Sequence, residues 1–216
     1  MVFSQFFVGP SYFCLAMPYL KKMDVGYGSR NRTTLTEFFK NSSIALALAT
    51  ADSDNHLVLV NEQFTKLTGY DNANVIGKNC RLLQTSPRGL HAENTEAKAK
   101  IHAFLKPDGP TTVRTPIVNF RKNEQAFVNL LFMSKLTGAA GKISYIFASQ
   151  FDVSRTHPDL LQTYDVALGD ALSRLKPLLD GHNVLIEGTL ATLANSTTTI
   201  AQAKLTLAEL ETNSPY

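Results

Sequence analysis

The chain has 216 residues, of which 44% are apolar and 18% are charged, and its formal net charge is +3. This composition can fill one hydrophobic core without help from a metal or a disulfide. The two cysteines, Cys14 and Cys80, are far apart and form no C-x-x-C pair, which argues against a zinc site and indicates a reducing, cytoplasmic setting. The weak charge, without basic runs interleaved with aromatics, argues against a nucleic-acid surface.

The first twenty residues, Met1 to Leu20, carry no charge and are dense in aromatic side chains. A secretory signal would place positive charge before its apolar run, and a membrane span would need about 20 apolar residues without Pro10 and Pro18. We therefore expect a soluble N-terminal extension over residues 1–33, with no membrane association. Such a segment, if ordered, covers apolar surface on the domain or on a second copy of the chain. Met23 is an alternative natural start.

A short helix and a β-hairpin are predicted next. The helix begins after a cap at Thr34 or Thr36. Two apolar runs, residues 44–50 and 56–60, flank a polar turn and read as the paired strands of a hairpin. The regular domain therefore opens with β structure.

The middle of the chain is predicted to be helical but broken. Asn61 caps a helix that Gly69 ends, and short helical turns follow up to Gln84. After a loop, a further helix starts at Asn94 and runs to about Leu105.

Three strand-like runs follow, over residues 111–121, 126–135 and 143–152. A β-β, helices, β-β-β order predicts an α+β fold, in which a five-stranded antiparallel sheet has helices gathered on one face. We expect this domain to span residues 34–155 and to hold a ligand between the sheet and the helices.

The last part of the chain, residues 156–216, is predicted to be a C-terminal helical extension. Apolar residues recur at three- and four-residue steps, at Leu161, Tyr164, Leu168, Leu172, Leu175 and Leu179. Pro177 and the Asp180-Gly181 pair are expected to interrupt this helix. A second stripe follows at Ile186, Leu190, Leu193, Ile200 and Leu207.

Together the two stripes predict a helical hairpin. Its narrow apolar stripe must pack on the preceding domain, on its own return helix or on a partner chain. We expect it to serve dimerisation and signal output, and we predict a homodimer.

One stretch, GKNCRLLQ over residues 77–84, resembles the signature G-x-N-C-R-F-L-Q of the light-oxygen-voltage (LOV) family. Only Leu82 departs from it, and the resemblance covers about Leu46 to Asp152. It implies the PAS/LOV fold and a flavin bound between helices and sheet. FMN is the expected cofactor, with FAD as the alternative because the segment after Gln84 is longer than in the commonest LOV domains.

Several residues are predicted to hold this flavin. Amide side chains suit the polar edge of its ring because each both donates and accepts hydrogen bonds. The predicted polar contacts are Asn79, Gln84, Asn119, Asn129 and Gln150, and the predicted apolar walls are Leu83, Leu105, Leu131 and Met133. Arg81 is assigned to the phosphate, with His102 where many relatives place a second arginine and Lys98, Lys100 and Arg88 as alternatives. The histidines form no metal spacing, so no metal site is predicted.

Cys80 is the predicted reactive residue. No neighbour in the sequence lowers its pKa, so its thiol should stay protonated in the dark. The resemblance implies that blue light makes Cys80 bond reversibly to ring carbon C4a while ring nitrogen N5 gains a proton. Because N5 then changes from acceptor to donor, the Gln150 amide should rotate, and Asp152 two residues later leads the change to the C-terminal helices.

We therefore interpret the chain as a blue-light photoreceptor without catalytic activity. It would act through dimer rearrangement or on a separate downstream signalling protein. One alternative is the sensor module of a truncated or degenerate LOV histidine kinase, although no glycine-rich nucleotide loop follows. The other is a light-regulated DNA-binding regulator, which the weakly basic segment Asn195 to Lys204 does not favour.

Overall fold

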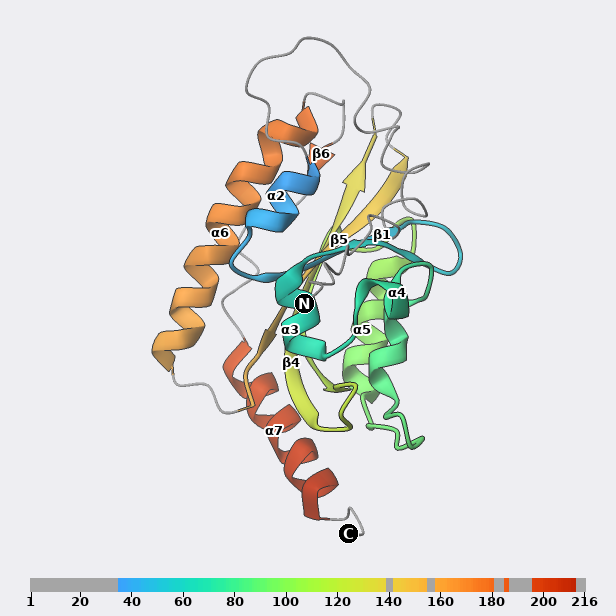
Figure 1. Ribbon diagram of the computed structural model, residues 1–216, viewed down its shortest axis with the longest axis vertical. Helices are drawn as coiled ribbons and strands as arrows, with labels where there is room; N and C mark the ends of the chain where they lie inside the picture. Colours follow the sequence, from blue (N-terminus) through green and yellow to red (C-terminus); the bar gives the residue numbers. More distant parts are fainter. Residues whose placement is uncertain (1–34, 139–141, 155–157, 181–184, 187–195, 213–216) are drawn as a thin grey trace, which may run out of the picture.

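The computed structural model describes residues 35–138, 142–154, 158–180, 185–186 and 196–212 (Figure 1). The predicted extension over residues 1–33 lies outside them. The core is one antiparallel sheet with strand order β2-β1-β5-β4-β3. Its strands are β1 (Ala45–Thr50), β2 (Leu57–Val60), β3 (Thr112–Phe120), β4 (Ala126–Thr137) and β5 (Ile143–Asp152). The predicted five-stranded sheet and α+β class are confirmed.

A short sixth strand extends this sheet. β6 (Leu185–Ile186) pairs with the end of β4, at Leu136 and Thr137. β3 begins its pairing with β4 only at Ser134, so the last backbone groups of β4 are open on that side and accept a further strand. Ile186 therefore belongs to the sheet, and its assignment to a second helical stripe was wrong.

The helices between β2 and β3 lie on one face of the sheet, as predicted. They are α3 (Glu62–Thr68), α4 (Asn72–Val75), the 3₁₀ helix η1 (Cys80–Gln84) and α5 (Thr95–Leu105). Helices outside this segment cover the opposite face (Figure 1). They are α2 (Leu35–Asn41), α6 (Pro158–Asp180) and α7 (Ser196–Thr212).

Large and small side chains alternate along β1, which explains how the sheet packs against helices on both of its faces. Leu46 and Leu48 are fully buried in the main core with Phe147 and with Leu168 of α6. The alternate alanines of β1 face the other way, toward α3 and η1. Since successive strand residues point to opposite faces, the bulky leucines fill the core under α6 and leave room on the other side.

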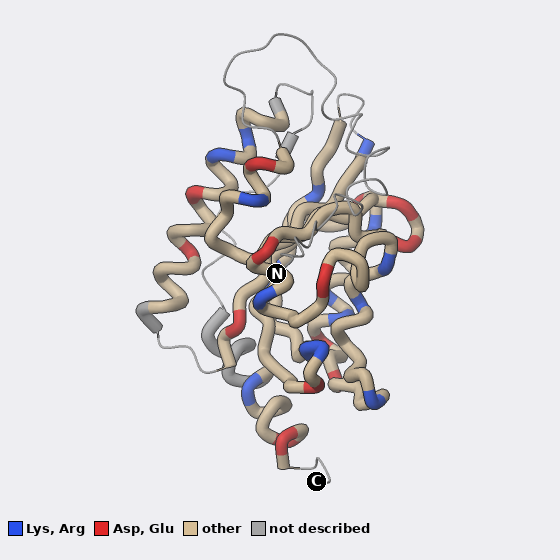
Figure 2. Tube along the Cα trace, viewed as in Figure 1, with Lys and Arg blue, Asp and Glu red and all other residues tan. Residues whose placement is uncertain are grey.

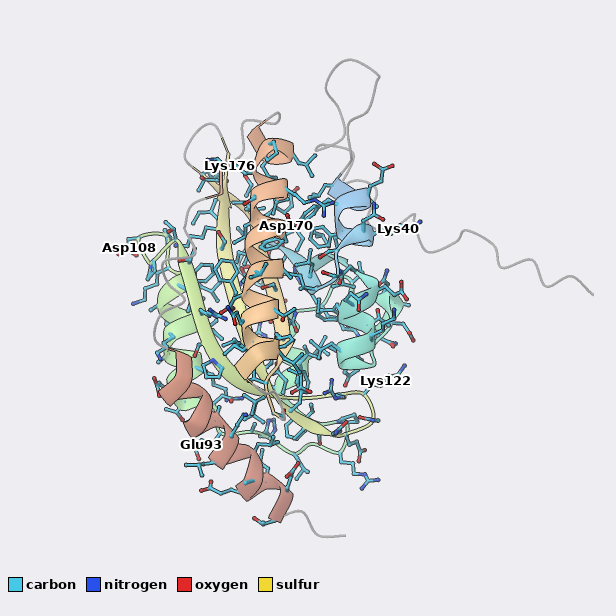
Figure 3. All side chains as sticks on the ribbon, turned by 90° about the vertical axis from the view of Figure 1, so that its left-hand side faces the viewer. Lys40, Glu93, Asp108, Lys122, Asp170 and Lys176 are labelled. Atoms are coloured by element: carbon cyan, nitrogen blue, oxygen red, sulfur yellow. The ribbon has the colours of Figure 1, made fainter. Side chains whose placement is uncertain are left out.

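The amphipathic stripe of α6 packs on the sheet of the same chain, the first of the three predicted alternatives. Tyr164, Leu168, Leu172, Leu175 and Leu179 are all buried. Figure 3, turned toward this side, shows α6 along the sheet, with Asp170 and Lys176 on the helix.

Two predictions for this region were wrong. α6 ends at Asp180, as the Asp180-Gly181 pair predicted, but Pro177 does not interrupt it, because that proline lies in the last turn and removes only one backbone hydrogen bond there. α7 lies across β3 and β4 and does not run along α6 (Figure 1), so the two helices form no hairpin. The physical reason is that the sheet already buries the apolar face of α6.

Two asparagines fix the helices to the sheet. Asn61 caps α3, as predicted, by accepting a hydrogen bond from the Phe64 backbone N–H at 3.0 Å, and Gly69 ends the helix with a φ of 75°. Asn94 precedes α5 but does not cap it. Its side chain instead pairs with both backbone groups of Val118, each at 2.9 Å, and so ties α5 to the edge of β3.

The other edge of the sheet, β2, is also covered. The Leu57 N–H donates to the Lys78 carbonyl at 2.9 Å, the Gly77 N–H donates to the Leu57 carbonyl at 2.8 Å, and His56 forms an isolated bridge with Asn79. The segment that leads into η1 thereby continues the hydrogen bonding of the sheet.

Charges are spread over the fold. Basic and acidic residues are interspersed along the chain, with a cluster of acidic residues in the loop between β1 and β2 (Figure 2). No helix in the described part of the chain is long and apolar enough to cross a membrane.

Candidate functional site

A cavity of about 360 Å³ lies between the sheet and the helices η1 and α5. Small-molecule sites in proteins commonly fall in the range of about 300–1,000 Å³. Ten predicted site residues line it: Asn79, Cys80, Arg81, Gln84, His102, Leu105, Asn119, Asn129, Leu131 and Met133. The structure therefore gathers residues from the motif, from α5 and from β3 and β4 around one space.

Two predicted site residues do not line the cavity. Leu83 is fully buried and packs with Phe64 and Val75, because it fills the space between η1, α3 and α4. Gln150 lies next to the cavity wall, where its side chain contacts Asn129.

Other lining residues were missed from the sequence. On the sheet these are Ala47, Ala49, Leu57, Ile117 and Ile146, and elsewhere they are Ser53, Asn55 and Ile101. Ala148 of β5 also lines the cavity. Two signals could have found some of them. The Ala/Leu alternation of β1 marks a small-residue face, and Ile101 precedes Leu105 by one helical turn.

Three amide side chains form a row across β3, β4 and β5. The Asn129 Nδ2 donates to Asn119 Oδ1 at 2.9 Å and to Gln150 Oε1 at 3.3 Å. All three residues are buried. This is the grouping that the sequence predicted for the polar edge of a ring.

The row contains one unsatisfied donor. Gln150 Nε2 is buried and has no hydrogen-bond partner among the described residues. A buried donor left without a partner costs about 1–3 kcal/mol, so an acceptor supplied by a bound molecule would stabilise it. A ring with acceptor atoms along one edge, such as that of a flavin, fits this requirement.

Cys80 lies on the helical side of the same cavity, at the start of η1. The Asn79 side chain caps this helix by accepting a hydrogen bond from the Arg81 N–H at 2.8 Å. Burial raises the pKa of the Cys80 thiol to about 12. The thiol is therefore protonated at neutral pH, in agreement with the expectation from the sequence.

This raised pKa predicts that Cys80 is inert toward alkylating reagents in the folded state. A pKa of about 12 instead of 9.0 lowers the thiolate fraction at pH 8 about a thousandfold, and only the thiolate reacts. In a Cys14→Ser variant, with Cys80 as the remaining cysteine, iodoacetamide should react at least ~100-fold more slowly in buffer than in urea. Mass spectrometry follows the reaction, and equal rates in the two conditions would contradict the raised pKa of the thiol.

Basic side chains lie at the rim of the cavity. Arg81, Lys98 and His102 are lining residues from η1 and α5. Arg81 Nη2 pairs with Asp54, which also accepts from His56 Nε2 at 2.9 Å. The rim is thus suited to a negatively charged tail, with Asp54 as a competitor for the guanidinium.

Two alternative phosphate ligands lie elsewhere. Lys100 pairs with Glu96 at 2.6 Å, and Arg88 pairs with Glu124 at 2.7 Å. Neither lines the cavity. Among the described residues, no group of acidic, histidine or cysteine side chains has the arrangement of a metal site.

Comparison with known proteins assigns this arrangement to a family. Residues 43–155 match the model of the PAS domain. The chain therefore belongs to the PAS domain family. The cysteine motif and the similarity to solved LOV proteins make it, within that family, a LOV domain.

Two solved structures cover most of the chain. The Rhodobacter sphaeroides LOV protein is 25% identical, with a TM-score of 0.59 over 83% of this chain and 96% of that one. The d2 variant of RsLOV is 27% identical, with a TM-score of 0.57 over 82% of this chain and 94% of that one.

The curated relatives are longer proteins. A blue-light-activated histidine kinase of Rhizobium johnstonii is 39% identical over 101 residues, which are 47% of this chain and 27% of the kinase. One of Brucella ovis is 34% identical over 101 residues, 19% of its length. The match thus spans about a quarter or less of these relatives.

Proposed function

We propose that the protein is a blue-light receptor that binds FMN in the cavity and responds to light through Cys80. One observation carries this proposal: the protonated, half-buried thiol of Cys80 faces the same cavity as the amides of Asn119 and Asn129, and Gln150 beside them has an unpaired amide nitrogen. The names of the curated relatives, which are blue-light-activated kinases, support it.

The residues around the cavity suit the parts of this ligand. Asn119 and Asn129 would hold the polar edge of the ring, and Leu131 and Met133 would contact its apolar surface. Lys98, His102 and Arg81 would hold the phosphate at the rim. FAD is the alternative ligand, and the mass of the released cofactor distinguishes the two.

When bound, the flavin supplies blue-light absorption and, in its excited state, a ring carbon (C4a) that accepts a sulfur. Cys80 would supply the sulfur from the cavity wall and would give up its S–H proton to the ring as the sulfur bonds, and it would take that proton back when the bond breaks in the dark. Because the reaction starts from the neutral thiol, the site needs no nearby base to convert Cys80 into a thiolate first.

Gln150 is the residue whose hydrogen bonding changes when the ring nitrogen gains this proton. Its unpaired Nε2 can donate to an acceptor, but a ring nitrogen that has gained a proton requires the amide oxygen instead. That oxygen now accepts from Asn129 Nδ2 at 3.3 Å. Rotation of the Gln150 amide therefore breaks its hydrogen bond with Asn129. It also brings two donor groups, Gln150 Nε2 and Asn129 Nδ2, next to each other.

The output of this receptor is proposed to be conformational. We infer a cytoplasmic homodimer without catalytic activity, which signals through α6 and α7 or to a separate protein. A second candidate is a sensor module for a histidine kinase, favoured by the kinases among the relatives. Light-dependent autophosphorylation of a chain fused to such a kinase tests that candidate.

A visible absorption spectrum before and after a blue flash tests the receptor proposal. We expect the purified protein, loaded with FMN if necessary, to show a structured flavin band that bleaches and recovers in the dark. Free lumiflavin in the same buffer is the control. It has the same ring but no protein around it, so it should not show the reversible bleaching. A protein that binds no flavin, or a bound flavin whose band does not bleach, would refute the proposal.

A further inference from the structure

Two polar contacts join α6 to the sheet on the face opposite the cavity. The hydroxyls of Ser149 and Tyr164 lie 2.8 Å apart, and Arg114 Nη2 forms an ion pair with Asp165. Ser149 and Tyr164 are almost completely buried, and the Arg114 side chain is 2% exposed. Burial also raises the pKa of Tyr164 to about 12, so its hydroxyl is neutral. The surrounding core is apolar, which makes both contacts specific points of attachment.

These contacts lie directly behind the proposed flavin-sensing glutamine. Ser149 and Phe151 precede and follow Gln150 on β5 and point to the other face, because strand residues alternate. Phe151 stacks on Tyr164 with ring centroids 4.3 Å apart and an interplanar angle of 9°. Tyr164 therefore touches both chain neighbours of Gln150.

This arrangement couples the strand to the helix. If β5 shifts at Gln150, Ser149 shifts with it through the shared peptide bond. The Tyr164 hydroxyl must then follow, which moves α6, or lose its hydrogen bond inside an apolar core. The flat stack with Phe151 transmits movement in the same direction.

The ion pair between Arg114 and Asp165 fixes α6 to the sheet one residue after Tyr164. Asp165 is next to Tyr164 on α6, while Arg114 belongs to β3, two strands away from β5. Arg114 Nε and Nη1 are buried without partners among the described residues. If Asp165 moved away, the buried guanidinium would lose its ion-pair partner, which is strongly destabilising. Displacement at Tyr164 therefore turns α6 about its contact with β3.

We propose that Tyr164 is a positioning residue that reports the state of Gln150 to α6 through Ser149 and Phe151, with the Arg114–Asp165 pair as the pivot. The inference rests on the proposed function, since Gln150 responds only if the cavity holds a light-sensitive flavin. It names the residues through which a signal leaves the domain.

Hydrogen–deuterium exchange of the α6 amides, in the dark and under blue light, tests this inference on the full chain loaded with FMN. In the wild type we expect light to change exchange within α6. In Tyr164→Phe, which removes one hydroxyl, exchange in the dark should rise about fivefold. The difference between light and dark should then be lost, while flavin bleaching is retained. Gln162→Ala, at an exposed position on the same helix, is the matched control and should behave as the wild type.

Ser149→Ala removes the same hydrogen bond from the strand side. It should reproduce the effect of Tyr164→Phe, and the double variant should add nothing to either, as expected for two halves of one contact. A Tyr164→Phe protein that exchanges faster but keeps the full difference between light and dark would reduce the contact to a structural role and overturn the inference. So would a wild type that bleaches without any change in α6, whereas a wild type that does not bleach refutes the receptor proposal itself.

Discussion

Cys80→Ala should abolish the reversible bleaching of the flavin band completely while leaving flavin binding intact. The thiol is the group that faces the cavity from η1, and Cys80 is the only cysteine among the described residues. Alanine keeps the helix and removes only the sulfur. The loss should therefore be total, whereas the flavin affinity should change by less than about tenfold, because one small side chain leaves the contact surface.

Flash absorption and flavin titration of the same preparation measure these two quantities. Cys14→Ser is the matched control, since it removes the other sulfur of the chain, and it should bleach and recover as the wild type does. Reversible bleaching that persists in Cys80→Ala would mean that the light reaction does not use this thiol. Loss of flavin binding in the variant would instead assign Cys80 a packing role.

Asn61→Ala should reduce the free energy of unfolding by about 3–4 kcal/mol. The Asn61 side chain is buried and makes four hydrogen bonds to backbone groups. Its Oδ1 accepts from the N–H groups of Leu46 and Phe64 at 2.9 and 3.0 Å, and its Nδ2 donates to the carbonyls of Ile44 and Phe39 at 2.8 and 3.2 Å. Alanine leaves all four groups without that partner.

Urea unfolding followed by circular dichroism gives the change in stability from the shift of the midpoint at constant slope. Asn72→Ala provides the comparison because Asn72 is an exposed asparagine of α4. It should change stability by less than about 0.5 kcal/mol. If Asn61→Ala cost no more than Asn72→Ala, the junction of α2, β1 and α3 would not depend on this side chain.

The strands could be predicted because their signals are local. Alternation of apolar residues and the intervening turns located β1 to β5 to within a few residues, and Asn61 and Gly69 marked α3 through backbone chemistry at its two ends. The surfaces on which α6 and α7 pack could not be predicted in this way. A helical stripe shows that one face is buried but does not identify the surface that covers it.

The same distinction holds for the cavity. Residues with unusual chemistry, such as Cys80, Asn119 and Asn129, stand out in the sequence and meet in space. Ala47 and Ile146 resemble ordinary core residues, and only the sheet shows that they face the cavity. Leu83 belongs to the motif but serves packing, which residue type alone does not reveal.

Both edge strands of the sheet form backbone hydrogen bonds with segments outside it, and this restricts how copies of the domain can assemble. Asn94 pairs with the backbone of Val118 on β3, and residues 77–79 pair with β2. Open edges invite pairing between chains, which leads to continuous intermolecular sheets and to aggregation. At these positions of the described part of the molecule, association through a shared sheet is therefore disfavoured. A dimer built from side-chain contacts between helices could form and separate with light without breaking a ladder of backbone hydrogen bonds.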